Sequence, residues 1–275
     1  MPDLPEGDQP AEEVAGAATS VPAMPKPPKP IRPLSPPSRP GTVVPEDPYH
    51  LGHPGKVRYH IEPPDDVFAS ELFRSWGLND PGRGDLRALA AVPHTSEGHL
   101  SIHQTHTSKG LRLEAEWPGV FDATRRLEYD PNWGGPVIRN DSLQIARHLR
   151  GHGLGTQMLA TQVHAALNNG FRAITLQAVG GKSLAESHVA NGHYTWPLLG
   201  FDGPLQPDHR IELPRPFKKA RTIHELFRMP GGLAAWKEHG HTIYCDFDLH
   251  PESNSVGILN AYLKAKGMSP VGLRK

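Results

Sequence analysis

A glycine-rich turn stands between a strand pattern and a helix pattern near the middle of this 275-residue chain. Three of the five residues from Gly151 to Gly155 are glycines, and the sequence of 153–169 is typical of a helix. Glycine at a helix start costs conformational entropy, so its presence there needs a reason. One reason is a tight strand–helix connection. The other is an anion that binds bare backbone N–H groups at a helix N-terminus.

The patterns on both sides of this turn predict the type of sheet. Residues 137–145 before it and 172–179 after it are typical of buried strands, and a strand–helix–strand unit predicts that the two strands are parallel. Upstream, 99–106 and 110–119 alternate apolar and polar residues, which predicts an antiparallel hairpin, and 123–130 continues the strand series. We therefore expect an α/β (α+β) fold, with a mixed, mainly antiparallel sheet that contains one parallel pair and is flanked by helices.

Composition divides the chain into three parts. Residues 1–55 hold half of the 30 prolines and almost no aromatic residues, so they cannot bury enough apolar surface to fold, and a disordered arm is expected. Residues 56–213 carry the sheet pattern, beginning with a short strand near 56–64. Residues 214–275 form an α/β extension whose apolar side chains predict that it packs on the domain. These side chains are Ile243, Tyr244, Phe247, Leu249, Leu259 and Leu263.

The proline-rich arm has its own periodic pattern. Pro27, Pro30, Pro33 and Pro36 recur every third residue, which lines up one face of a polyproline II helix. Such a stripe fits an SH3-like groove on a partner. A stiff, solvated linker explains the same pattern.

Charge and cysteine content exclude several classes of protein. Lys plus Arg equal Asp plus Glu, 29 of each, so no overall field favours nucleic acid. The single cysteine, Cys245, excludes an intramolecular disulfide and a cysteine-based zinc site. The acidic N-terminus is unlike a signal peptide, and no long apolar run is present. We expect a cytoplasmic protein that binds neither membrane nor nucleic acid.

Two common phosphate-binding motifs do not fit the glycine turn. A P-loop ends in Gly-Lys-Ser/Thr, whereas Gly155 is followed by Thr156 and Gln157. The dinucleotide-binding fingerprint has a different glycine spacing and opens a series of parallel strands. What does fit is Arg-x-x-Gly-x-Gly, filled here by the residues from Arg150 to Gly155, with Leu143-Gln144-Ile145 ending a strand five residues earlier. This motif resembles the pyrophosphate loop of the GNAT family of N-acetyltransferases.

The resemblance implies acetyl-CoA or coenzyme A as a co-substrate. In that family the diphosphate lies on the glycine turn, where backbone N–H groups and the helix dipole favour an anion. The pantetheine arm pairs with the strand that ends before the turn, between two splayed strands. The cofactor-binding residues implied are Leu143, Ile145, Arg150, Gly151, His152, Gly153, Leu154, Gly155 and Thr156.

The catalytic residues that the resemblance implies are less complete. The family has Tyr-x-x-x-Gly-Phe, but four residues before Gly200-Phe201 this chain has Trp196, and an indole cannot protonate a leaving thiolate. Tyr194, two residues earlier, is the candidate acid, although a packed aromatic explains it as well. Glu128 and Asp141 are candidate bases. Both are equally consistent with ordinary exposed carboxylates.

The resemblance therefore implies an N-acyltransferase that moves an acyl group from acetyl-CoA to a small-molecule or protein amine by direct attack. Two alternatives stay open: an inactive GNAT-like binding or scaffold protein, and an adaptor that acts through the proline-rich arm. Seventeen histidines invite a metal site, but no His-Glu-x-x-His pattern occurs and no metal is expected.

Overall fold

The computed structural model describes residues 65–93, 99–105, 110–180 and 191–273. The described residues belong to one compact unit, Asp47–Lys275. The expected proline-rich arm over 1–55 and the expected strand over 56–64 lie outside the described residues.

The strands from 99 onward and the helix after the glycine turn follow the order that the sequence predicted. The helices are α1 Asp65–Ser75, α2 Arg83–Leu89, α3 Leu154–Asn168, α5 Gly192–Leu198, α6 Pro207–Glu212, α7 Ile223–Arg228, α8 Gly232–His239 and α9 Asn254–Ala265, with short 3₁₀ turns η1 at Arg147–Leu149 and η2 at Arg215–Phe217. The strands are β1 His99–Gln104, β2 Leu111–Trp117, β3 Phe121–Asp130, β4 Gly135–Ile145, β5 Ala173–Ala178 and β6 Ile243–Asp248.

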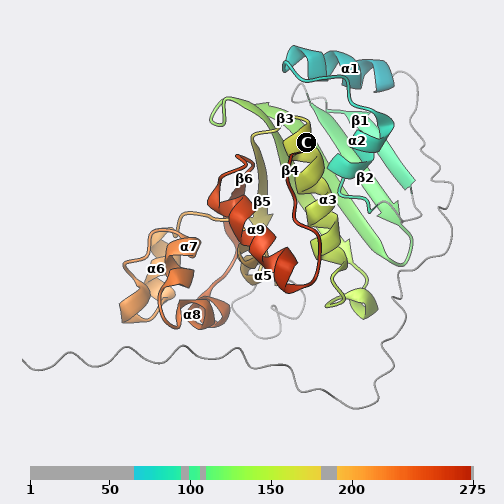
Figure 1. Cartoon of the computed structure of the whole chain (residues 1–275). Helices are drawn as coiled ribbons and strands as arrows, with labels where there is room; N and C mark the ends of the chain where they lie inside the picture. The colour runs from blue at the N-terminus through green and yellow to red at the C-terminus, as the bar shows by residue number, and fades with distance from the viewer. Residues whose placement is uncertain (1–64, 94–98, 106–109, 181–190, 274–275) are drawn as a thin grey trace, which may run out of the picture. The chain divides into compact units, whose positions relative to one another are not determined.

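The six strands form one sheet, in which each strand lies beside its neighbours in sequence, from β1 to β6. Strands β1 to β4 form an antiparallel meander. Strand β5 is parallel to β4 and antiparallel to β6. The expected fold class is therefore confirmed: a mixed, mainly antiparallel sheet with one parallel pair, flanked by helices (Figure 1).

One face of the sheet carries the core. A row of side chains in register crosses five strands, and each of them is completely buried. The row consists of Leu111, Leu127, Ile138, Ile174 and Phe247. Because successive residues of a strand point to opposite faces, the residues next to these along each strand point to the other face of the sheet.

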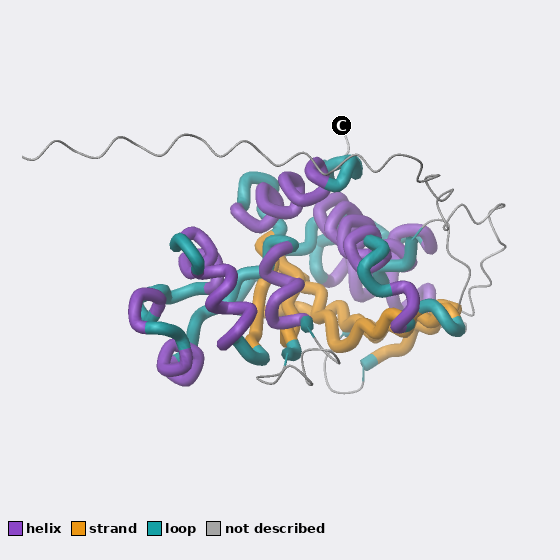
Figure 2. Tube along the Cα trace, turned by 90° about the horizontal axis from the view of Figure 1, so that it is seen from below, coloured by secondary structure: helices purple, strands orange, loops and turns teal. Residues whose placement is uncertain are grey.

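Helices α3 and α9 lie side by side against this buried face (Figures 1 and 2). The helix expected over 153–169 is present as α3, and its apolar side is buried, with Met158 and Val163 completely inaccessible to solvent. The helix ends at Asn168, and Gly170 follows with a left-handed backbone (φ +79°). This left-handed glycine turns the chain into β5.

The C-terminal segment completes the same sheet. Strand β6 pairs with β5 from Ala173–Asp248 to Ala178–Ile243, so this segment joins the sheet. Helix α9 begins after Ser253, whose hydroxyl accepts a hydrogen bond from the Val256 amide, and it buries Leu259 and Leu263. The expectation was wrong for Tyr244. Its side chain is 71% exposed, because it alternates to the face of β6 opposite the core.

Within the described ranges, no helix has the length and apolar character that crossing a membrane requires.

Candidate functional site: the glycine turn and the open edge of β4

Two glycines of the turn have a backbone conformation that other residues rarely adopt. Gly151 has a φ of +83° and Gly153 a φ of +88°. A side chain in this left-handed region is strained, which explains both glycines by turn geometry alone. A Cβ added at either position would meet no atom within 4 Å. The turn therefore leaves open space beside its backbone.

Helix α3 begins without a side-chain cap. Gly153 is its N-cap residue, and the first helical hydrogen bond runs from the Gln157 amide to the Gly153 carbonyl at 3.0 Å. The three amides before Gln157, from Leu154 to Thr156, are among those that a helix leaves without a partner at its start. Helices α7 and α9, by contrast, are capped by the hydroxyls of Thr222 and Ser253. Helix α8 shares the uncapped glycine start, so this geometry alone is not specific.

The charge around the turn distinguishes α3 from α8. No aspartate or glutamate occurs from Ser142 to Ala185, and Arg147 and Arg150 lie next to the turn. Both arginines are exposed, and the Nε of Arg150 donates a hydrogen bond to the carbonyl oxygen of Ile145 at 2.9 Å. The helix dipole and these two arginines both favour an anion at the start of α3. Sequence reasoning missed this signal, although counting acidic residues along the chain would have found it.

Strand β4 continues beyond its pairing with β5. Parallel pairing runs from Val137–Ala173 to Asn140–Leu176, whereas β4 extends to Ile145. Over Asp141–Ile145, β4 pairs with no described strand on the β5 side, while Ser142, Leu143, Gln144 and Ile145 pair with β3. We call this five-residue stretch the open edge of β4.

The register shows which backbone groups face away from β3. The Ala146 amide donates to the Val120 carbonyl at 2.8 Å, so Ile145 and Phe121 form a non-hydrogen-bonded pair. Because such pairs alternate along an antiparallel ladder, Leu143 opposite Ala123 is also non-hydrogen-bonded. The N–H and C=O groups of Leu143 therefore point to the side from which β5 has departed.

The open edge and the start of α3 lie next to each other. A Cβ added at Gly155 would lie 3.3 Å from the Cδ1 of Ile145, the last residue of β4. A residue larger than glycine at this position would press on the strand end. The predicted cofactor-binding residues, from Leu143 to Thr156, thus form one continuous region of the molecule.

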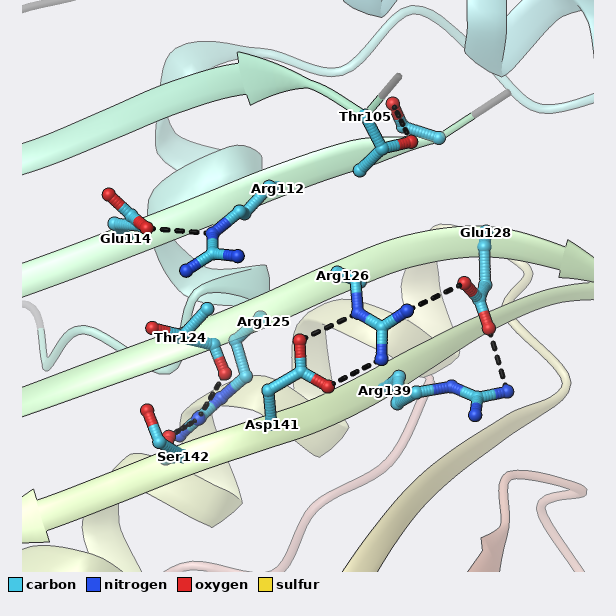
Figure 3. Close-up of polar contacts among 11 residues, drawn as sticks. Thr105, Arg112, Glu114, Thr124, Arg125, Arg126, Glu128, Arg139, Asp141 and Ser142 are labelled. Carbon is cyan, nitrogen blue, oxygen red and sulfur yellow. Dashed lines mark hydrogen bonds and ion pairs between the residues drawn. The ribbon is translucent and has the colours of Figure 1, made fainter. Parts of the chain in front are cut away.

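The two candidate bases both belong to ion pairs (Figure 3). Asp141, at the beginning of the open edge, receives two hydrogen bonds from Arg126, at 2.6 and 2.7 Å. Glu128 pairs with Val137 across the ladder, toward the other end of β4, and its carboxylate lies 2.8 Å from Arg139 and 3.7 Å from Arg126. Neither carboxylate is therefore free of a charged partner, and a proton acceptor at either position would act next to arginine.

Tyr194 lies at the carboxyl end of β5, on α5. The His193 amide donates to the Val179 carbonyl at 3.2 Å and fixes the start of this helix. The Tyr194 side chain is half-buried, with the Nζ of Lys237 5.3 Å from its ring centroid. Trp196 packs edge-on against Phe201, with ring centroids 5.3 Å apart. The indole at the usual tyrosine place therefore belongs to the packing of this region.

A group of metal-ligand types occurs elsewhere, at Asp208, His209 and His241, where one ligand atom of each lies within 4.8 Å of the others. The Nδ1 of His209 accepts from the Gln206 amide at 3.1 Å, and its Nε2 lies 3.1 Å from the Thr242 carbonyl. Both ring nitrogens of His209 are thus in use. The His209 and His241 rings are also stacked, with centroids 4.2 Å apart, so their in-plane lone pairs do not converge on one ion. We assign no metal to this group.

No protein-family model and no curated protein matches this sequence.

Proposed function

We propose that this protein is an acetyl-CoA-dependent N-acyltransferase of the GNAT type. The observation that supports it best is the contact between the open edge of β4 and the uncapped start of α3. The diphosphate would accept hydrogen bonds from the amides between Gly151 and Thr156, beside Arg150 and His152. The pantetheine amides would pair with the backbone of Leu143 at the open edge.

The reaction that fits this arrangement is direct attack of an amine on the thioester carbonyl. The C–N bond forms, the C–S bond breaks, and coenzyme A leaves as a thiolate that takes up a proton. Tyr194 is the candidate donor of that proton, and Asp141 or Glu128, directly or through water, the candidate acceptor of the amine proton. A covalent acyl-cysteine is disfavoured, because Cys245 is buried and burial, with the charges of Asp202 and Asp246, raises the pKa of its thiol.

The experiment that tests the proposal adds a negative charge where the diphosphate would lie. Thr156→Glu places a carboxylate at the third position of α3, where it stabilises the helix through the dipole and the free amides. We expect the melting temperature to hold or rise while the acetyl-CoA affinity falls at least tenfold, about 1.4 kcal/mol. Thr156→Gln is the neutral control and should bind nearly as the wild type does. Wild-type protein that does not bind acetyl-CoA or coenzyme A in calorimetry at high micromolar ligand would refute the proposal.

An inactive, coenzyme A-binding relative is the second candidate. Two observations favour it: Trp196 at the usual tyrosine place, and the arginine ion pairs of Glu128 and Asp141. Turnover of acetyl-CoA with a panel of small amines and basic peptides separates the two candidates. Binding without turnover would favour the inactive relative. The third alternative, an adaptor that binds an SH3-like partner through the arm, lies outside the described residues.

A further inference from the structure

Two consecutive arginines hold the point where β4 leaves β5. Arg125 pairs with Asn140, but the preceding Thr124 pairs with Ser142, so Asp141 is an extra residue on β4. Such a β-bulge bends the strand and re-aims the residues beyond it. The open edge of β4 begins at this bulge, and Figure 3 shows both arginines beside it.

Arg125 reaches the bulge from the core face of the sheet. It occupies a buried row between Leu113 and Asn140, and only 1% of its surface is exposed. Its Nη1 donates to the carbonyl oxygen of Thr124 at 2.9 Å and to that of Ser142, on the two strands that flank the bulge. The guanidinium thus ties together the backbones of β3 and β4 where the register shifts.

The burial of Arg125 is costly. Burial lowers the pKa of its guanidinium to about 10, while the charges of Asp141 and Asp122 act in the opposite direction. Within the described ranges it has no carboxylate at ion-pair distance, and its Nε has no hydrogen-bond partner. A buried cation that is not paired with a carboxylate destabilises a fold, so the position of Arg125 needs an explanation.

Arg126 holds the same bulge from the opposite face. Its Nε and Nη2 donate to the two oxygens of Asp141 at 2.6 and 2.7 Å, a bidentate arrangement with fixed geometry. Its Nη1 lies 3.7 Å from Glu128, which in turn pairs with Arg139 at 2.8 Å. Asp141, the extra residue of the bulge, is therefore held by Arg126 of β3. Arg126 in turn lies next to Glu128, which pairs with Arg139 of β4.

We propose that Arg125, Arg126 and Asp141 are positioning residues that clamp the β4 bulge and aim the open edge at the thioester arm of an acyl-CoA. This inference rests on the proposed function. It gives Asp141 the role of holding the strand rather than of accepting a proton. It also predicts that the clamp affects the pantetheine and acyl end of the ligand and not its phosphates, which bind at the start of α3.

The test compares two ligands on clamp variants. Acetyl-CoA contains the pantetheine arm, and 3′-phosphoadenosine 5′-diphosphate keeps the phosphates but lacks that arm. For Arg126→Gln and for Asp141→Asn we expect acetyl-CoA affinity to fall about tenfold and the affinity for the truncated nucleotide to stay within about twofold. The double variant should lose no more than either single variant, because both remove the same ion pair. Arg126→Lys, which keeps the charge but loses the bidentate geometry, should fall in between.

Arg112→Gln is the matched control. Arg112 lies opposite Arg126 on the neighbouring strand β2, but its ion pair is with Glu114, at 2.7 Å, and not with Asp141. Its removal should leave both affinities unchanged. If Arg126→Gln weakens both ligands equally, or weakens neither while the wild type binds both, the clamp is refuted. If the wild type binds neither ligand, the proposed function fails first.

A ligand-free measurement keeps the clamp testable in that case. We expect Asp141→Asn to speed hydrogen exchange of the Gln144 amide, which faces β3, at least tenfold and to leave β2 unchanged. Equal exchange rates in wild type and variant would overturn the clamp, whatever the ligand results. Arg125→Lys should speed the same hydrogen exchange. Its melting curve is measured as well, because this buried position tolerates substitution least.

Discussion

The indole nitrogen of Trp236 donates a hydrogen bond to the backbone carbonyl of His193, at 2.9 Å. This bond joins α8, in the C-terminal segment, to the start of α5 beside β5. Trp236 is completely buried, and the rings of His193 and His209 lie against it, with centroids 6.3 and 5.8 Å away. A single side chain thus fastens the C-terminal helices to the helix that carries Tyr194.

Trp236→Phe should destabilise the whole protein by about 2–4 kcal/mol, since it leaves a smaller ring and a buried carbonyl without its donor. Chemical denaturation measures this loss as a lower transition midpoint. Leu233→Ala, on the same helix but 37% exposed, is the control and should cost under about 1 kcal/mol. Equal effects of the two variants would mean that Trp236 does not hold α8 in place.

Glycine-to-alanine substitutions should change the stability of the protein in opposite directions at the start of α3 and inside α9. Gly153→Ala forces a side chain into a left-handed backbone and should cost about 1 kcal/mol. Gly257→Ala, inside α9, adds a methyl group where no atom lies within 4 Å and should stabilise by about 0.5–1 kcal/mol. Thermal melts of both variants check the signs. A neutral Gly153→Ala would show that the turn does not need its left-handed glycine.

The stability of the fold should fall on acidification because of His193. Its side chain is buried, both ring nitrogens lack a partner among the described residues, and burial, followed by the charge of His241, lowers its pKa. The folded state therefore binds a proton less readily than the unfolded chain. The contribution of neutral His193 to the free energy of unfolding is complete above about pH 6.5 and is lost as the pH falls below that value.

The expected slope from this one group is at most about 1.4 kcal/mol per pH unit. Denaturation midpoints between pH 7.5 and 5 measure it, and His193→Gln should flatten the curve. His152→Gln, at an exposed position, should not. A wild-type curve that is flat down to pH 5 would contradict the prediction.

Tyr194→Phe should separate turnover from binding. If Tyr194 donates the proton to the leaving thiolate, kcat falls by at least about 100-fold while acetyl-CoA affinity is nearly unchanged. Tyr262→Phe is the matched control, because that ring also lies under a lysine, with the Nζ of Lys266 at 5.8 Å. Wild-type turnover in Tyr194→Phe would leave this tyrosine a packing role only.

Cys245 should be inert in the folded protein. Its side chain is 1% exposed, and burial raises the pKa of its thiol. A colourimetric thiol reagent should therefore detect almost no thiol under native conditions and one per chain in denaturant. Rapid labelling of the native protein would show that β6 opens locally.

Periodicity was sufficient to predict most of the fold. The buried side chains of β2 to β5 and the stripe of α3 stand at the spacings that their elements require, and a helix between two strands predicted the parallel pair. Tyr244 was misjudged because an aromatic residue in a strand was counted as core without regard to its alternation. Ile243 and Phe247 of β6 are buried, and Tyr244, which is next to Ile243 in the strand, points to the other face.

The bulge could not be predicted in the same way, because an extra residue is visible only against the register of the partner strand. Arg125 did leave a signal, since it alternates with Ala123 and Leu127 and so shares their buried face. The ion pairs of Asp141 and Glu128 depend on pairing between β3 and β4, which composition and spacing do not reveal.

The position of β5 has a consequence for synthesis of the chain. Its partner β4 precedes it, but its other edge stays bare until β6, about 65 residues later, has left the ribosome. Until then the nascent chain presents Ile174 and Leu176 on a strand with one unpaired edge, a template for association with other chains. We therefore expect that the last quarter of translation is when this protein depends most on chaperones, and that premature termination before residue 243 yields aggregates rather than a smaller folded domain.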